Sequence, residues 1–255
     1  MQSSIRILAL FAHPDDAEFL CAGTLAHLAE RGATVYIVTM TPGDCGSTIL
    51  PSSRISRIRR QEAKRSAAVI RAEYACLEER DLSIFYERKT IQKVMEQVRR
   101  TDPAIVFTHS PSDYMVDHET TSRICQTACF GACAPNYRTG ARPPAKPTRA
   151  IPPLYYAQPL GNRDILGTEV RPSVYVNIEA TRETKSRMLA CHESQGAWLQ
   201  AQQGLECPAN LMLEMTEKAG ALAGFRWAEG FRQHLGHGFP QQNVLRDFLG
   251  DLVRG

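Results

Sequence analysis

The chain has 255 residues, of which 43% are hydrophobic and 22% are charged, and its formal net charge is +3. This length is enough for one full α/β domain with a large core and does not require a second. The mild charge argues against a nucleic-acid-binding protein, and no apolar stretch approaches the ~20 residues of a membrane span. Eight scattered cysteines, with no C-x-x-C pair and no secretory leader, favour a reducing cytoplasm over a disulfide framework.

The first half of the chain alternates between short apolar runs and helical patterns. Strands are expected at residues 5–11, 35–40, 74–77 and 105–108. Helices are expected between them at 24–31, 54–71 and 90–100. This order predicts an α/β fold, with a Rossmann-like, mostly parallel sheet, helices on both faces and right-handed crossovers.

A Pro-rich segment interrupts this rhythm. Residues 134–153 contain six prolines and four basic side chains, which predicts a long surface loop or arm. Two interpretations stay open: an oligomer contact, or a lid over the substrate pocket whose basic residues would meet an acidic substrate.

The remainder of the chain is expected to complete a single domain. Strands are predicted at 154–157 and 174–178, and a helix at 181–203. We therefore expect a main domain over residues 1–205. The pattern of residues 206–255 predicts a helical C-terminal extension packed on that domain.

Candidate functional residues come directly after the first predicted strand. His13, Asp15 and Asp16 lie at its C-terminal end, where open α/β sheets bind ligands. An imidazole and one carboxylate can hold a zinc ion, which leaves the other carboxylate free as a base. Alternatively, the segment is a polar turn in which Asp16 caps the next helix. Glu18 would orient a ligand or simply favour the helix N-terminus.

A second cluster follows the strand predicted at 105–108. A catalytic zinc site needs a third protein ligand, and His118 is the best candidate, with His109 as its competitor. Asp117 is placed to brace a ligating or catalytic group. Two strand-end clusters that both contain His and Asp favour a metal site, with iron or cobalt as alternatives to zinc.

Several motifs together resemble a known family. Residues 12–18 (AHPDDAE) resemble the A-H-P-D-D-x-E signature of the LmbE/PIG-L family of zinc-dependent N-acetylglucosaminyl deacetylases. Weaker matches follow in the family's order over about residues 5–200. They are the T-x-G-x-x-G loop at 41–46, Arg59-x-x-Glu62, Asp117-His118, and Lys185 with the H-x-S-Q motif at 192–195.

The resemblance implies a role for each matching residue. The zinc ligands would be His13, Asp16 and His118, and Asp15 would be the general base. Arg59 and Asp81 fall where the family holds sugar hydroxyls, Asp81 by rough spacing only. From its own surroundings in the sequence, Arg59 would instead lie on a solvated helix face.

One position departs from the family pattern. Where the family usually carries H-P-D-H, this chain has Met115 in place of the first histidine, and a thioether cannot donate a proton. Losing such a donor typically costs ~10²–10³ in rate. Either the enzyme is slow, or Asp15 itself returns the proton while zinc stabilises the oxyanion, or Tyr114 or His192 fills the gap. We expect one of the last two.

The resemblance implies a hydrolase that removes the N-acetyl group from an amino sugar or its conjugate. A metal-dependent hydratase of an unsaturated carboxylic acid is the alternative enzyme, which Met115 makes more plausible and the intact His-Pro-Asp-Asp motif disfavours. A non-enzymatic carbohydrate-binding protein would have no need of Asp15. Family members often form trimers or hexamers, so a homo-oligomer is a further expectation.

Overall fold

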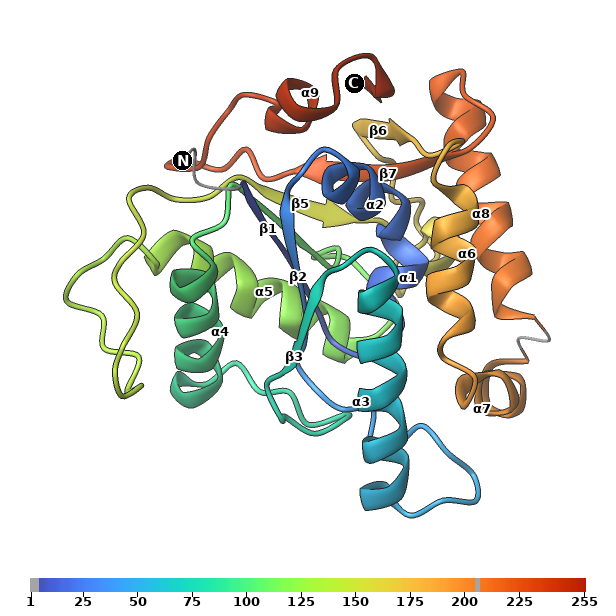
Figure 1. The fold of residues 1–255 in the computed structure, drawn as a ribbon, viewed down its shortest axis with the longest axis horizontal. Helices are drawn as coiled ribbons and strands as arrows, with labels where there is room; N and C mark the ends of the chain where they lie inside the picture. The colour runs from blue at the N-terminus through green and yellow to red at the C-terminus, as the bar shows by residue number, and fades with distance from the viewer. Residues whose placement is uncertain (1–4, 205–206) are drawn as a thin grey trace.

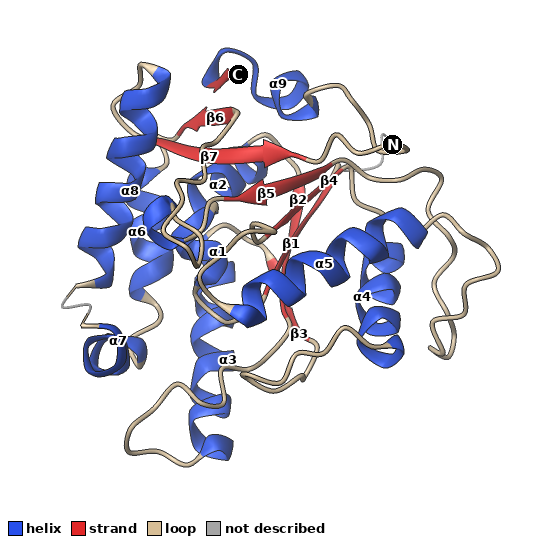
Figure 2. Cartoon of the chain, turned by 180° about the vertical axis from the view of Figure 1, so that it is seen from behind, coloured by secondary structure: helices blue, strands red, loops and turns tan. Residues whose placement is uncertain are grey.

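The computed structural model describes residues 5–204 and 207–255, which form one eight-stranded sheet of order β3-β2-β1-β4-β5-β7-β6-β8 (Figures 1 and 2). Five neighbouring strands are parallel, as predicted: β1 (Arg6–Phe11), β2 (Thr34–Thr39), β3 (Glu73–Cys76), β4 (Ile105–Thr108) and β5 (Leu154–Ala157). The other three pair antiparallel at one side of the sheet: β6 (Val174–Asn177), β7 (Ala228–Gln233) and β8 (Val253–Arg254).

Two apolar cores cover the two faces of the sheet. Because side chains alternate along a strand, Ile7 and Phe11 of β1 point into one core and Leu8 into the other. The first core is covered by α1 (Asp16–Leu20), α2 (Ala22–Glu30), α3 (Ser52–Val69), α6 (Arg182–Ala190), α8 (Pro208–Ala223) and α9 (Val244–Leu249). The second is covered by α4 (Arg88–Thr101) and α5 (Val116–Gly131). None of the described helices is long and apolar enough to cross a membrane.

The centre of the sheet contains the point where the strand order reverses. From β1 the chain proceeds outward to β2 and β3, and then returns to β4 on the other side of β1. In open α/β sheets the crevice beyond the carboxyl ends of two such strands is the usual ligand site. The fold therefore places the segments after Phe11 and after Thr108 next to each other.

The prediction of a helical C-terminal extension is only partly right, because the segment also contains two strands. Its first part forms α8, but β7 lies between β5 and β6, and β8 pairs with β6. The sequence of β7 (AEGFRQ) lacks β-branched residues. Pairing with a strand on each side, together with a buried ion pair of Glu229, overrides this low local propensity.

The single helix predicted at 181–203 is two helices, α6 and α7 (Gln195–Gln203). A residue of another helix stabilises the break between them. Glu62 of α3 accepts hydrogen bonds from the backbone N–H of Ser194 (2.9 Å) and from its hydroxyl (2.7 Å). A side chain far away in sequence thus ends one helix and starts the other.

The Pro-rich segment 134–153 is irregular, as predicted, and it packs on α4. Glu96 accepts hydrogen bonds from the Thr139 hydroxyl (2.6 Å) and the Ala145 N–H (3.0 Å). Arg99 donates to the carbonyl oxygens of Ala132, Ala134 and Tyr137. Two helix side chains therefore fix this arm to the body of the domain.

Candidate metal and catalytic site

The segment after β1 makes a sharp turn into α1. Asp15 precedes the first helical residue with φ of 97°, a left-handed conformation that Asp tolerates better than most residues. Its side chain makes no capping hydrogen bond. Asp16 is the first residue of α1 and accepts a hydrogen bond from the backbone N–H of His13 (2.7 Å). The alternative in which Asp16 is the helix cap is therefore wrong. Asp15 occupies the cap position, but its carboxylate does not cap the helix and can serve the site.

Three of the predicted metal-binding side chains converge at this edge. One donor atom each from His13, Asp16 and His118 lies within 4.8 Å of the others. His13 Nδ1 is 3.4 Å from Asp16 Oδ2, and His118 Nε2 is 3.5 Å from Asp16 Oδ1. The first residues after β1 and the first turn of α5 supply these groups.

The other nitrogen of each imidazole contacts a carboxylate. His13 Nε2 lies 3.1 Å from Asp117 Oδ2, and His118 Nδ1 lies 2.9 Å from Asp113 Oδ1. Carboxylates in this position fix the tautomer and orientation of metal-ligating histidines. Asp117 thus contacts His13, as a bracing group would. Asp113 was missed from the sequence, although a carboxylate in the loop before a candidate ligand is a signal for such a partner.

His109 lies directly behind this group. It stacks on His118 with ring centroids 3.8 Å apart, and its Nε2 lies 3.0 Å from the Ala12 nitrogen and 3.1 Å from Asp16 Oδ2. Burial and the neighbouring His118 lower the pKa of His109 to about 4. His109 Nε2 accepts the hydrogen bond from the Ala12 N–H, so a neutral His109 packs behind His118 and has no proton on Nε2 to donate to Asp16.

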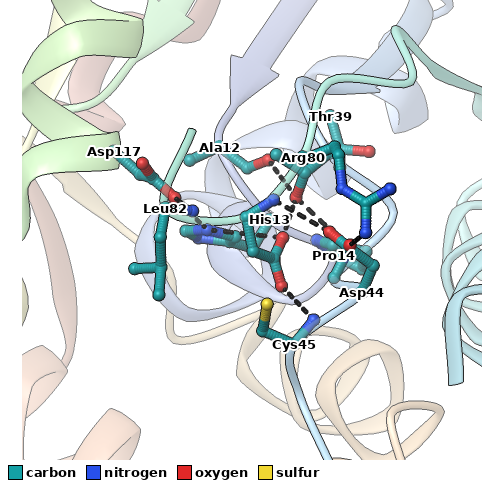
Figure 3. Close-up of polar contacts among 12 residues, drawn as sticks. Ala12, His13, Pro14, Thr39, Asp44, Cys45, Arg80, Leu82 and Asp117 are labelled. Atoms are coloured by element: carbon teal, nitrogen blue, oxygen red, sulfur yellow. Dashed lines mark hydrogen bonds and ion pairs between the residues drawn. The ribbon is translucent and has the colours of Figure 1, made fainter. Parts of the chain in front are cut away.

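Two other groups of possible ligands are already engaged. In the group formed by His109, Asp113 and His118, the Asp113 carboxylate contacts His118 Nδ1. In the group formed by Asp44, Cys45 and Asp81, the two carboxylates accept hydrogen bonds from the loop itself, and Arg80 pairs with Asp44 (Figure 3). Of the three groups, His13, Asp16 and His118 have the donor set best suited to a transition metal.

The electrostatic surroundings also fit a bound cation. Burial alone lowers the pKa of His13, but contacts with Asp117 and Asp16 and the charge of Asp81 outweigh it and raise the pKa to about 10. Figure 3 shows Asp117 beside His13 and Leu82. The Asp117 carboxylate also accepts a hydrogen bond from the backbone N–H of Leu82 (2.7 Å). Three carboxylates around one imidazole create a negative potential that a divalent cation would neutralise.

Replacing Asp113 by Asn is expected to weaken zinc binding by about 10–100-fold, because the neutral amide holds the His118 tautomer less firmly. The measurement is a competitive zinc titration against a chelating dye. Asp102→Asn is a matched control, since Asp102 forms an exposed ion pair with Arg6 at a distance of 2.8 Å. Equal zinc affinity in both variants would mean that Asp113 does not orient a ligand.

Asp15 contacts a buried arginine on α3. Arg59 Nη2 lies 3.3 Å from Asp15 Oδ2 and donates to the Pro14 carbonyl oxygen (2.6 Å). Burial raises the pKa of Asp15 to about 6, against the opposing charge of Arg59. Arg59 is only 4% exposed, so the alternative in which it lies on a solvated helix face is wrong. Arg59 lines the site cavity, and its Nε is buried without a hydrogen-bond partner.

Two glycines make room for this arginine. A Cβ at Gly43 would lie 2.2 Å from Arg59 Nη1, and one at Gly46 would lie 2.6 Å from the same atom. Both belong to the T-x-G-x-x-G loop between β2 and α3. The loop motif and Arg59 are therefore one structural unit.

Gly43→Ala is expected to cost about 1–3 kcal/mol of unfolding free energy from its φ of +72° alone, and more from the clash with Arg59. Gly140→Ala is the matched control, because Gly140 has φ of +81° and no atom within 4 Å of a Cβ. Urea unfolding of both variants isolates the contribution of the clash. Equal losses would contradict the close packing of Arg59 on the loop.

Of the remaining predicted site residues, three line the same cavity and one does not. Asp81, Tyr114 and Met115 line it together with the His–Asp–His group, Asp15 and Arg59. Asp81 also fixes the loop, because it accepts hydrogen bonds from the Thr41 hydroxyl (2.5 Å) and the Cys45 N–H (2.7 Å). His192 is not among the lining residues; it is buried with Nε2 3.2 Å from Glu18 Oε1. None of the lining residues comes from the Pro-rich arm, so a lid role for that arm finds no support.

Two curated proteins are similar to the chain over most of its length. It is 24% identical over 196 residues to 4-oxalmesaconate hydratase of Pseudomonas putida, covering 74% of this chain and 73% of that protein. It is 24% identical over 238 residues to diacetylchitobiose deacetylase of Thermococcus kodakarensis, covering 89% and 82%. Relatives of this chain thus include both a hydratase and a deacetylase.

A solved structure confirms the fold. The N,N'-diacetylchitobiose deacetylase of Pyrococcus horikoshii superposes with a TM-score of 0.79 at 23% identity, over 95% of this chain and 90% of that one. Residues 8–129 match the family described as PIG-L, GlcNAc-PI de-N-acetylase, and include most of β1, all of β2 to β4 and most of α5. The predicted resemblance is confirmed: this segment of the chain is a PIG-L (LmbE-like) family domain.

Proposed function

We propose that the protein is a metal-dependent hydrolase that removes the acetyl group from an N-acetylated amino sugar or its conjugate. The observation that carries the proposal is the pairing of two carboxylates at the end of β1. Asp16 faces two imidazoles in a ligand-like arrangement, whereas Asp15 faces Arg59 and lines the same cavity. This separation gives adjacent aspartates two different roles.

His13, Asp16 and His118 would hold the ion, zinc being the metal that best matches two imidazoles and one carboxylate. When bound, the ion supplies Lewis acidity toward the acetamide carbonyl and the attacking water. Asp15 accepts a proton from that water as it adds to the carbonyl carbon, and the C–N bond then breaks to give acetate and the free amine. Asp117 and Asp113 keep the two imidazoles oriented.

The proton must reach the departing nitrogen without a histidine at position 115. Met115 lines the cavity but has no proton to give. His192 is buried behind Glu18, so Asp15 itself is the proton donor we favour, with Tyr114 at the cavity wall as the second candidate. Arg59 and Asp81 line the same space and are placed to contact the sugar.

A hydratase acting on an unsaturated carboxylic acid is the second candidate, favoured by the relative from Pseudomonas putida and by Met115. Its substrate would need cationic partners for its carboxylates. Among the described residues that line the cavity, Arg59 is the sole lysine or arginine, and it already pairs with Asp15. The charge of the cavity therefore favours a neutral substrate.

The test is a comparison of two reactions on metal-stripped protein, with and without added Zn²⁺. Acetate release from a panel of N-acetyl amino sugars measures amide hydrolysis, and loss of conjugated absorbance from an unsaturated dicarboxylic acid measures hydration. Zinc-dependent acetate release alone supports the proposal. Loss of absorbance without acetate would overturn it in favour of the hydratase.

A further inference from the structure

The cavity has two chemically different sides. The metal-site residues, Asp15 and Arg59 form a charged side, while apolar side chains from several elements form the rest of the lining. Phe19 and Leu20 come from α1, and Leu160 from the 3-10 helix η1 (Leu160–Asn162). Leu20 belongs to the first core, and Phe19 and Leu160 pack against it, so the fold explains this part of the apolar lining.

One face of α7 closes this apolar side. Its four lining residues, Gln195, Trp198, Leu199 and Gln202, follow the i, i+3, i+4, i+7 spacing of a single helix face. The side chains of Trp198 and Leu199 are half-buried, and neither belongs to, or packs against, the two cores of the sheet. The fold therefore does not account for these two large apolar residues.

The position of α7 is coupled to the catalytic side. Ser194, just before the helix, is held by Glu62 of α3, the helix that also carries Arg59. Gln195 Nε2 donates to the Gly46 carbonyl oxygen (3.4 Å) in the glycine loop that surrounds the Arg59 guanidinium. A group resting on α7 would thus have a fixed position relative to Asp15.

Charge limits what that group can be. Arg59 is the sole lysine or arginine among the described lining residues, and its Nη2 contacts the Pro14 carbonyl oxygen and the Asp15 carboxylate. A phosphate or carboxylate on the distal side of the substrate would find no cationic partner on the apolar wall. A neutral apolar or aromatic group would bury its surface there and could stack on the indole.

Resting on the deacetylase function proposed above, we propose that the substrate is an N-acetyl amino sugar joined to an uncharged apolar or aromatic aglycone. The aglycone binds against Trp198 and Leu199 of α7, and the acetamide points to the His–Asp–His group. Trp198 is then a specificity-determining residue for the aglycone and takes no part in the bond-breaking step.

The experiment compares three N-acetylglucosaminides, the methyl, phenyl and 4-carboxyphenyl glycosides, in both anomers, with zinc-loaded protein. We expect kcat/KM for acetate release from the phenyl glycoside to exceed that of the methyl and 4-carboxyphenyl glycosides by roughly tenfold. Trp198→Ala should remove most of that advantage while changing the methyl glycoside less than about threefold. Trp198→Phe should restore part of it, and Gln200→Ala, an exposed change on the same helix, should leave all three values unchanged.

The possible failures are distinguishable. No acetate from any glycoside would overturn the deacetylase function on which the inference rests. Acetate from all three at similar kcat/KM, or an equal loss for all three in Trp198→Ala, would overturn the inference alone, since Trp198 would then serve the sugar or the fold. A preference for the 4-carboxyphenyl glycoside would overturn the assignment of an uncharged aglycone.

Discussion

Asp15→Asn is expected to lower the rate of acetate release by about 10²–10⁴ while leaving the bound metal unchanged. Asn cannot accept the proton of the attacking water, but it has the same shape as Asp and also tolerates the left-handed conformation that Asp15 adopts at φ of 97°. The fold of the turn should therefore survive. The measurements are kcat at saturating zinc and the zinc content per chain.

Asp16→Asn provides the contrast. Asp16 faces both candidate ligand imidazoles, so its loss should reduce zinc content and activity together. The assignment of roles would be wrong if Asp15→Asn lost zinc to the same degree as Asp16→Asn. It would also be wrong if Asp15→Asn kept more than about a tenth of the wild-type rate.

Lys185→Met is expected to lower the free energy of unfolding by about 3–5 kcal/mol, because it breaks a fully buried ion pair. Lys185 Nζ lies 2.6 Å from Glu229 Oε1 and donates to the Phe19 carbonyl oxygen (2.7 Å). Glu229 also accepts hydrogen bonds from the backbone N–H groups of Gly23 and Thr24 at the start of α2. Removing the lysine leaves a buried carboxylate without its cation.

The chain offers a matched control for this change. Lys93 also contacts one carboxylate, Glu79 (2.7 Å), and one carbonyl oxygen, but its side chain is 44% exposed. Lys93→Met should cost no more than about 1 kcal/mol. Urea unfolding measures both, and the double variant Lys185→Met with Glu229→Gln should be more stable than Lys185→Met. Equal losses at positions 93 and 185 would contradict the buried network.

The first half of the site could be predicted because it is local. His13, Asp15 and Asp16 follow a short apolar run that is typical of a buried strand, and the alternation of elements puts its end at a ligand-binding edge. The second half required a choice between His109 and His118, which both follow β4; the sequence favoured His118, and the family resemblance implied the same residue. Only the start of α5 after a seven-residue loop turns His118 toward Asp16 and leaves His109 behind it.

The features that the sequence left open or predicted wrongly depend on contacts between distant segments. Arg59 lies in the most basic stretch of the chain, which left a solvated helix face open as an alternative, and it is buried where Gly43 and Gly46 leave space for its guanidinium. Strand β7 was missed because its buried Glu229 reads as a surface residue until Lys185 is placed beside it. The sequence shows residue types and local periodicity, whereas these contacts exist only after folding.

The proposed function requires one metal ion, held by His13, Asp16 and His118, for amide hydrolysis in this cavity. The most direct test adds Zn²⁺ stepwise to metal-stripped protein and follows acetate release from phenyl N-acetylglucosaminide after each addition. We expect a linear rise to a plateau at one equivalent of zinc per chain, and no rise for Asp16→Asn. Acetate release that is independent of added zinc, or a plateau that Asp16→Asn also reaches, would contradict it.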